Sequence, residues 1–148
     1  MKLFFEHRNG MWVINGEGWD KNRVDANLNE GDIEIWDFIN TARTWFHPVH
    51  VHLVDFQILE CNCQVPFPYE RGWKDVVYVG EDDFVRVIAR FRPHKGKYTI
   101  HCHNTAHEDH NMMTQFEVGQ DEPDPMSVPA QPLPVESLLY KVTLFWGQ

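Results

Sequence analysis

Two short windows contain most of the metal-binding side chains of this 148-residue sequence. Seven of its nine histidines lie between residues 47 and 52 or between residues 101 and 110, and the second window also contains a cysteine. Neutral imidazole is the commonest metal ligand in proteins and suits copper, zinc, iron and nickel. Surface histidines are normally scattered along a chain, so this clustering indicates a metal-binding function.

The first window, residues 47–52, reads HPVHVH. Side chains two positions apart point to the same face of an extended strand, so His50 and His52 are expected to project toward a common point. His47 precedes a proline, which favours an extended or turn conformation at the beginning of the strand, and its ring is free to point elsewhere. The window predicts a metal site, with a hydrogen-bonded polar cluster as the alternative.

The second window begins with His101-Cys102-His103. If these residues end a strand, His101 and His103 face one way and Cys102 faces the opposite way. A single tripeptide then supplies imidazoles to one metal centre and a thiolate to another. A buried structural thiol does not by itself account for a histidine on each side of the cysteine.

Two further donors, His107 and Met112, follow Cys102 at regular spacing. This loop brings a thiolate, an imidazole and a thioether together, and His47 is the natural fourth donor from a distant strand. Two histidines, one cysteine and a weak axial methionine form the ligand set of blue copper sites. Zinc competes because it also binds cysteine and histidine, but a thioether is a poor zinc ligand. The donor set therefore favours copper.

The elements that must position these side chains are predicted to be short strands. Strands are expected at 33–38, 50–60, 75–79, 84–91, 97–102 and 114–118, with a turn at 29–32 and a proline-containing loop at 61–72. In the strand at 84–91, Val85, Val87 and Ala89 share one face, while Arg86 and Arg90 lie on the other. No stretch longer than a few turns has helical periodicity. The pattern predicts an all-β antiparallel sandwich or barrel.

The length suits one domain with a hydrophobic core. We expect this domain to cover residues 1–119, followed at 120–148 by a tail with five prolines and an apolar end, VESLLYKVTLFWGQ. A Pro-rich spacer permits two arrangements, in which the tail covers the domain's own core or docks on another chain. The sequence leaves both open.

The formal net charge of −9, from 22 acidic and 13 basic residues, argues against nucleic acid as a partner, because such a surface repels phosphate. No apolar run approaches the roughly 20 residues that cross a bilayer, so no membrane partner is expected. The start, MKLFFEHRNG, does not have the pattern of a signal peptide. The chain is thus expected in the cytoplasm as written, or in the periplasm or outside the cell if a leader was removed. Cys61 and Cys63 are too close for an easy mutual disulfide, and the redox compartment stays open.

HPVHVH and HCHNTAHEDHNMM, together with WVINGEGWD, GDIEIWDFIN and GWKDVV, resemble the last cupredoxin domain of multicopper oxidases, the family of laccases and bilirubin oxidases. The resemblance covers about residues 12–118. It implies a cupredoxin-like Greek-key β-sandwich with copper as the cofactor. It also implies the ligands of each copper: type 1 at His47, Cys102, His107 and Met112, type 2 at His50, and the type 3 pair at His52, His101 and His103.

The resemblance further implies an oxidase activity. Phenols, aromatic amines or metal ions would give up single electrons at the type 1 site, with His47 nearest the substrate, and O2 would be reduced to water at the trinuclear cluster. Cys102 is joined through the backbone to His101 and His103, which implies the path between the two sites. Glu108 matches an acidic residue that helps to deliver protons in some bacterial members; the alternative is an ordinary exposed acid.

The family's trinuclear cluster uses eight histidines, and this sequence carries the four of the last domain. The family's first domain contributes two His-x-His pairs, whereas the remaining histidines here, His7, His94 and His110, are isolated. We expect a companion cupredoxin chain to supply the missing pairs; a homodimer and a piece of a longer oxidase are the alternatives. Met1 and the distinct apolar tail favour a complete gene product, and hence the companion chain. If nothing completes the cluster, the chain is an electron-transfer or copper-binding cupredoxin that uses the type 1 site alone.

Overall fold

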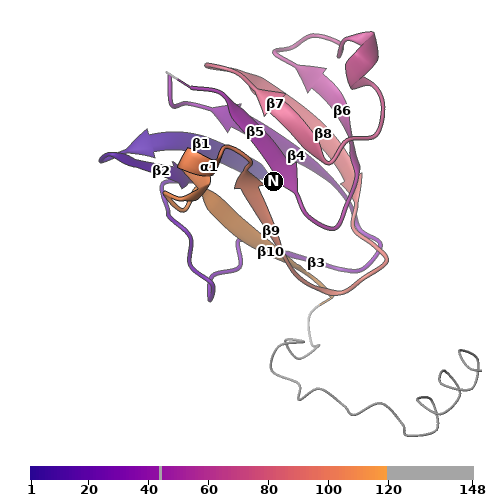
Figure 1. Ribbon diagram of the computed structural model, residues 1–148. Helices are drawn as coiled ribbons and strands as arrows, with labels where there is room; N and C mark the ends of the chain where they lie inside the picture. The colour runs from indigo at the N-terminus through magenta and orange to yellow at the C-terminus, as the bar shows by residue number, and fades with distance from the viewer. Residues whose placement is uncertain (44, 120–148) are drawn as a thin grey trace, which may run out of the picture.

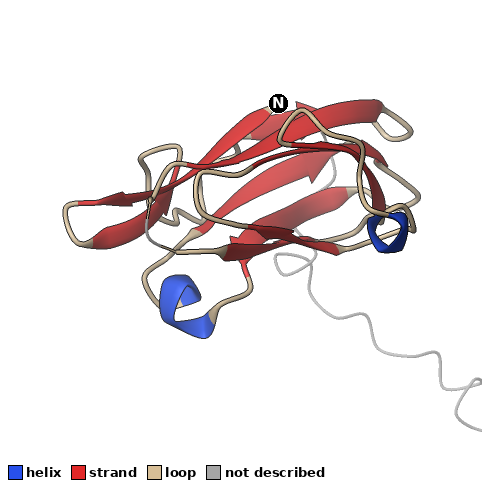
Figure 2. Ribbon diagram, turned by 90° about the horizontal axis from the view of Figure 1, so that it is seen from above, coloured by secondary structure: helices blue, strands red, loops and turns tan. Residues whose placement is uncertain are grey.

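The computed structural model describes residues 1–43 and 45–119. The Pro-rich tail predicted at 120–148, and its docking role, lie outside the described residues. The described part forms two five-stranded β-sheets that pack face to face, with the hydrophobic core between them (Figures 1 and 2). The prediction of an all-β sandwich is confirmed.

The first sheet has the strand order β2-β1-β4-β8-β6 and is antiparallel except where β1 runs parallel to β4. Its strands are β1 (Lys2–Arg8), β2 (Met11–Ile14), β4 (Ile33–Asn40), β6 (Phe56–Cys61) and β8 (Phe84–Arg90). The second sheet has the order β3-β10-β9-β5-β7 and is parallel where β3 meets β10. Its strands are β3 (Ala26–Leu28), β5 (His47–Val51), β7 (Val76–Val79), β9 (Gly96–Cys102) and β10 (Met113–Val118). From β4 to β9 each successive strand lies in the opposite sheet, so every connection in this stretch crosses between the two sheets.

Helical structure in residues 1–43 and 45–119 is limited to the 3-10 turn η1 (Pro68–Glu70) and the short helix α1 (Thr105–Glu108). No helix in this part of the chain has the length and apolar character needed to cross a bilayer. The helix α1 follows β9 directly and lies beside β2 (Figure 1), where its His107 contacts Trp12.

Strand alternation decides which side chains enter the core. On β8, Val85, Val87 and Ala89 are buried as predicted, whereas Arg86 lies on the outer face. On β5 the same alternation turns His47 inward, so that a histidine enters a core that is otherwise mostly apolar.

The predicted single strand over residues 50–60 is wrong. The chain leaves the second sheet after β5 and begins β6 in the first sheet at Phe56. Leu53 has a positive φ of 76°, a backbone conformation that residues other than glycine rarely adopt. This conformation ends the regular hydrogen bonding of the strand. Val54 is buried in the crossover, so the apolar pattern runs on across the break and hides it in the sequence. Strands β1, β2 and β3 were not predicted.

Two salt bridges of Arg86 join three neighbouring strands on the outer face of the first sheet. Arg86 on β8 donates from Nε to Asp37 Oδ1 at 2.8 Å and from Nη2 to Asp37 Oδ2 at 3.1 Å, and its Nη1 lies 3.3 Å from Glu60 Oε2. The hydrogen bonds from Arg86, and then the charge of its guanidinium, hold the pKa of the buried Asp37 below its ordinary value of 3.8. This pair helps to hold β4 against β8.

Replacement of Asp37 by asparagine is expected to lower the free energy of unfolding by about 1 to 3 kcal/mol at neutral pH, because charge-assisted hydrogen bonds of a buried carboxylate are lost. The pKa of Asp37 is lower in the folded than in the unfolded chain, so its contribution is complete above pH 3.8 and is lost as the pH falls through the folded-state pKa. Urea unfolding at neutral pH and at about pH 3 measures the difference in the free energy of unfolding between the variant and the unaltered chain. This difference should be smaller in acid. Asp82→Asn, at an exposed turn, is the control. An equal difference at both pH values contradicts this role of Asp37.

Candidate metal centres

The inner group consists of His47, Cys102 and His107, whose ligand atoms lie within 4.8 Å of one another. His47 begins β5, Cys102 ends β9, and His107 lies on α1. The Cys102 Sγ lies 3.5 Å from His47 Nδ1 and 3.4 Å from His107 Nδ1. All three side chains are buried. The fold therefore brings a thiol and two ring nitrogens from three separate elements to one point in the core.

Met112 lies on the core side of the second sheet, next to the inner group. The antiparallel register that pairs His101 with Met113 places Met112 opposite Cys102, and the Cys102 N–H donates to the Met112 carbonyl oxygen at 3.1 Å. Directly opposite residues present their side chains to the same face of a sheet. Met112 is fully buried, as the prediction of an axial ligand requires.

Local backbone hydrogen bonds hold the loop that carries His107. The Asn104 side chain caps α1 by accepting a hydrogen bond from the Ala106 N–H at 3.1 Å. The His107 N–H donates to the Asn104 carbonyl oxygen, and the Met112 N–H donates to the His107 carbonyl oxygen. Backbone hydrogen bonds thus join the two ends of the loop from Cys102 to Met112 and fix His107 in its middle.

Burial determines the protonation of the inner group. Removal from water lowers the pKa of His47 to about 4, and the neighbouring His107 ring adds to this effect. Burial also lowers the pKa of His107 and raises the pKa of the Cys102 thiol to about 11. Before a metal binds, the group at neutral pH is therefore a neutral thiol between two neutral imidazoles.

The residues of the inner group fit a copper ion. Sulfur is a weak hydrogen-bond partner, yet two ring nitrogens are directed at the same sulfur. Sulfur at about 2.3 Å and nitrogen at about 2.0 Å from a tetrahedral metal are about 3.5 Å apart. The observed Sγ···Nδ1 distances of 3.4 and 3.5 Å match this spacing.

The outer group consists of His50, His52 and His101, whose ligand atoms also lie within 4.8 Å of one another. His50 and His101 are opposite each other in the β5–β9 register, and His52 Nε2 lies 3.2 Å from His101 Nε2. In the tautomer that carries its hydrogen on Nδ1, His50 donates to the Asp75 carbonyl oxygen at 2.9 Å. This orients the ring and leaves Nε2 unprotonated, which is the usual arrangement of a metal-binding histidine.

His103 and Glu108 border the outer group. The His103 ring centroid lies 5.3 Å from that of His101 and 5.8 Å from that of His50. The partly exposed Glu108 places Oε1 3.7 Å from His101 Nδ1. Burial lowers the pKa of His101, and the Glu108 carboxylate opposes this shift. Glu108 thus borders the outer group, and its role in proton delivery stays a prediction.

Strand alternation separates the two groups at β9, as the sequence predicts. Cys102 is directed into the core and its neighbour His101 toward the outer face. The structure gathers all eight predicted ligands, although their binding of copper stays a prediction. The inner side holds His47, Cys102, His107 and Met112, and the outer side holds His50, His52, His101 and His103.

Aromatic side chains that the sequence did not indicate cover the inner group. Trp12 on β2 stacks on His107, and Phe5 on β1 stacks on His47 with ring centroids 5.6 Å apart. Trp12 lies within the WVINGEGWD stretch that carries the family resemblance, but nothing in that stretch indicates its contact with a distant histidine. His47, expected nearest the substrate, is fully buried.

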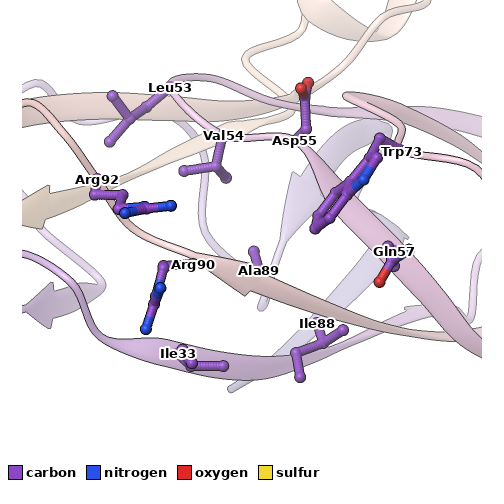
Figure 3. Close-up of a pocket in the computed structure, with 10 residues that line it drawn as sticks. All are labelled: Ile33, Leu53, Val54, Asp55, Gln57, Trp73, Ile88, Ala89, Arg90 and Arg92. Atoms are coloured by element: carbon purple, nitrogen blue, oxygen red, sulfur yellow. The ribbon is translucent and has the colours of Figure 1, made fainter.

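A groove of about 640 Å³ lies on the outer face of the first sheet, away from the inner group. Figure 3 shows Arg90 and Arg92 on one side of it and Trp73 on the other. Its lining, within the described part of the chain, contains none of the predicted copper ligands. A second hollow, of about 270 Å³, is lined in part by His50 and His52, so the outer group is open to a partner or to solvent.

The fold and the two ligand groups together define a copper-binding β-sandwich domain of the cupredoxin type. A family model described as multicopper oxidase matches residues 2–122. The chain belongs to the multicopper oxidase family, whose cofactor is copper. The predicted family, fold and cofactor are thereby confirmed.

Individual relatives match the chain over most of its length but over a small part of their own. Bilirubin oxidase of Albifimbria verrucaria is 44% identical over 111 residues, which are 71% of this chain and 19% of that protein. A laccase of Bacillus subtilis is 30% identical over 131 residues, 76% of this chain and 25% of that protein. The crystal structure of McoA multicopper oxidase from Aquifex aeolicus has a TM-score of 0.74 at 30% identity, covering 80% of this chain and 29% of that one. The chain spans a quarter or less of the length of these two curated relatives.

Proposed function

We propose that this chain is part of a laccase-like copper oxidase. In this proposal the inner group takes single electrons from a phenol, an aromatic amine or a metal ion. The outer group is one half of the trinuclear cluster that reduces O2 to water. The observation that carries the proposal is the direction of side chains at the end of β9: Cys102 lies between two buried imidazoles, and His101 lies in the outer group.

Bound copper supplies the one-electron redox chemistry. The chain's own residues hold it, exclude water and connect the two groups. Cys102, His47 and His107 would bind it in a pocket from which water is excluded, and Met112 lies on the same core side. A dry pocket of fixed geometry lets the surrounding residues set the reduction potential.

The outer group supplies imidazoles and a nearby acid to the half-cluster. The Asp75 carbonyl oxygen orients His50, and His52 and His101 point their Nε2 atoms toward each other. Glu108 holds a carboxyl 3.7 Å from His101 Nδ1, and in this proposal it helps to supply the protons that reduction of O2 to water consumes.

The missing half of the cluster is proposed to come from a companion cupredoxin chain that carries two His-x-His pairs. The exposed position of His52 and His103 and the open hollow beside His50 support a partner on this face. A homo-oligomer that opposes two outer groups is the second arrangement. The third is a longer oxidase in which the other domains are part of the same polypeptide.

Copper titration of the purified chain tests the proposal. The chain alone should develop a blue absorption band with a single copper in the inner group, and should consume no O2 when a phenol is the donor. Addition of a cupredoxin chain with two His-x-His pairs should start O2 consumption, and analytical ultracentrifugation separates this case from a homo-oligomer. If the monomeric chain alone oxidises the phenol with a complete cluster bound, the companion chain is not needed.

The second candidate function is electron transfer without oxidase activity. The completeness of the inner group within this chain favours it, since a type 1 site needs no further residue. It leaves the outer group without a role. Under this reading, a chain with His50→Ala and His101→Ala would exchange electrons with its redox partner as fast as the unaltered chain.

A further inference from the structure

Neither imidazole of the inner group reaches solvent in the described structure. His47 is 0% exposed and His107 is 2% exposed, and the Cys102 sulfur between them is also buried. An electron donor outside the protein therefore cannot touch a ligand ring. Its electron must cross the side chain that covers these rings.

Trp12 covers both rings. Its indole stacks on His107, with ring centroids 4.1 Å apart and an interplanar angle of 30°, and meets His47 edge-on at 5.5 Å and 68°. Trp12 is half-buried on β2, so the residue that contacts His107 is itself partly exposed to solvent. The exposed His7 ring lies on it at 4.6 Å.

Trp45 is a second indole beside His107, with a less favourable geometry. Its ring centroid is 5.4 Å from that of His107 and the two rings are almost perpendicular, at 80°. Electronic coupling across a van der Waals contact falls steeply with distance and is larger between overlapping ring faces than at an edge. Trp12 is therefore the better coupled of the two indoles.

We propose that Trp12 is the residue across which electrons from an external donor reach the inner group. This inference rests on the proposed function, because a copper(II) ion in the inner group must accept the electron. A phenol donor loses one electron and releases one proton to water, and the electron converts copper(II) to copper(I). The indole couples the donor electronically to the copper ion, and it is itself neither oxidised nor reduced overall.

A role for Trp12 as a mere cover makes the opposite prediction. If the indole only kept donors at a distance, a smaller side chain would let them come closer to His107 and would accelerate electron uptake. If the indole couples the donor to His107, loss of the ring slows electron uptake. The sign of the change in rate therefore distinguishes the two roles.

The test compares Trp12→Leu and Trp12→Phe with Trp73→Phe in the copper-loaded chain. Stopped-flow bleaching of the blue band by hexacyanoferrate(II), a one-electron donor, measures electron uptake. Trp12→Leu should slow the bleaching roughly tenfold, and Trp12→Phe should slow it less, because a phenyl ring keeps part of the stacked face. Trp73, which lines the groove of Figure 3, is the control and should change nothing. Unchanged or faster bleaching in Trp12→Leu overturns the proposal.

Two further readouts do not depend on turnover. Loss of the indole exposes the ligand rings to water and shifts the reduction potential of the blue site, so the potential is measured in each Trp12 variant and the rates are compared at equal driving force. A rate change that the shifted potential explains in full overturns the proposal. Copper should quench the fluorescence of Trp12, so Trp12→Phe should lose this quenched component and Trp73→Phe should keep it.

Should Trp12→Leu fail to fold, Trp12→Phe decides by the same measurements. Absence of the blue band in the unaltered chain overturns the proposed function and this inference with it, while a normal band with unchanged rates overturns this inference alone.

Discussion

Replacement of Cys102 by serine is expected to abolish the blue colour of the copper-loaded chain completely. The colour of a blue copper site arises from charge transfer between thiolate and copper, and a hydroxyl cannot replace the thiolate. His47 and His107 keep their positions on β5 and α1, so the variant should still bind copper, more weakly and without the intense band. Copper titration followed by visible absorption and electron paramagnetic resonance measures both effects.

The chain offers matched controls for this substitution. Cys61 and Cys63 are free cysteines outside the inner group, the first partly buried and the second exposed. Cys61→Ser and Cys63→Ser should keep the full colour. Circular dichroism of the copper-free Cys102→Ser variant checks that a polar hydroxyl in the core has not unfolded it. Blue colour that survives Cys102→Ser would refute the type 1 assignment.

Replacement of His101 by alanine is expected to reduce O2 consumption of the assembled oxidase to background while the blue band remains. His101 lies in the outer group, and its neighbour Cys102 lies in the inner group, so the substitution removes a ligand of the half-cluster without touching the thiolate site. Loss of one of the imidazoles that converge on the outer group leaves an incomplete ligand set for O2 reduction. Oxygen-electrode measurements with a phenol donor, together with the visible spectrum, test this separation.

His94→Ala is the matched control, because His94 is exposed and is isolated from the other histidines in the sequence. It should change neither the blue band nor O2 consumption. Persistence of O2 consumption in His101→Ala would remove the outer group from the mechanism. Loss of the blue band in the same variant would show that the two groups are not independent.

The geometry around Cys102 could be predicted because it depends on one local property, the two-residue period of a strand. Given that β9 ends at Cys102, the opposite directions of Cys102 and His101 follow without knowledge of the rest of the fold. The spacing of Met112 was informative for a similar reason, since a hairpin that closes between β9 and β10 places it opposite Cys102. Both predictions require only the location of a strand and of its last residue, and the sequence pattern indicated both.

Contacts between distant elements could not be predicted in this way. The approach of Trp12 to His107 depends on the β1–β2 hairpin lying beside α1, and no local pattern encodes that arrangement. The anchor of His50 is a backbone carbonyl oxygen, that of Asp75, and every residue has such an oxygen. The crossover between β5 and β6 was missed because Val54 continues the apolar pattern through it.

The closed loop from Cys102 to Met112 has a consequence for how fast the site can exchange electrons. The hydrogen bonds that hold Cys102, His107 and Met112 join backbone groups to one another, so they do not require a metal. Donor atoms held in this way need to shift little when the charge of a bound ion changes by one. A small shift of the nuclei means a small reorganisation energy, and transfer can then be rapid even at a low driving force. The same rigidity would let copper be inserted late in the maturation of the protein, into a pocket that already has its final shape.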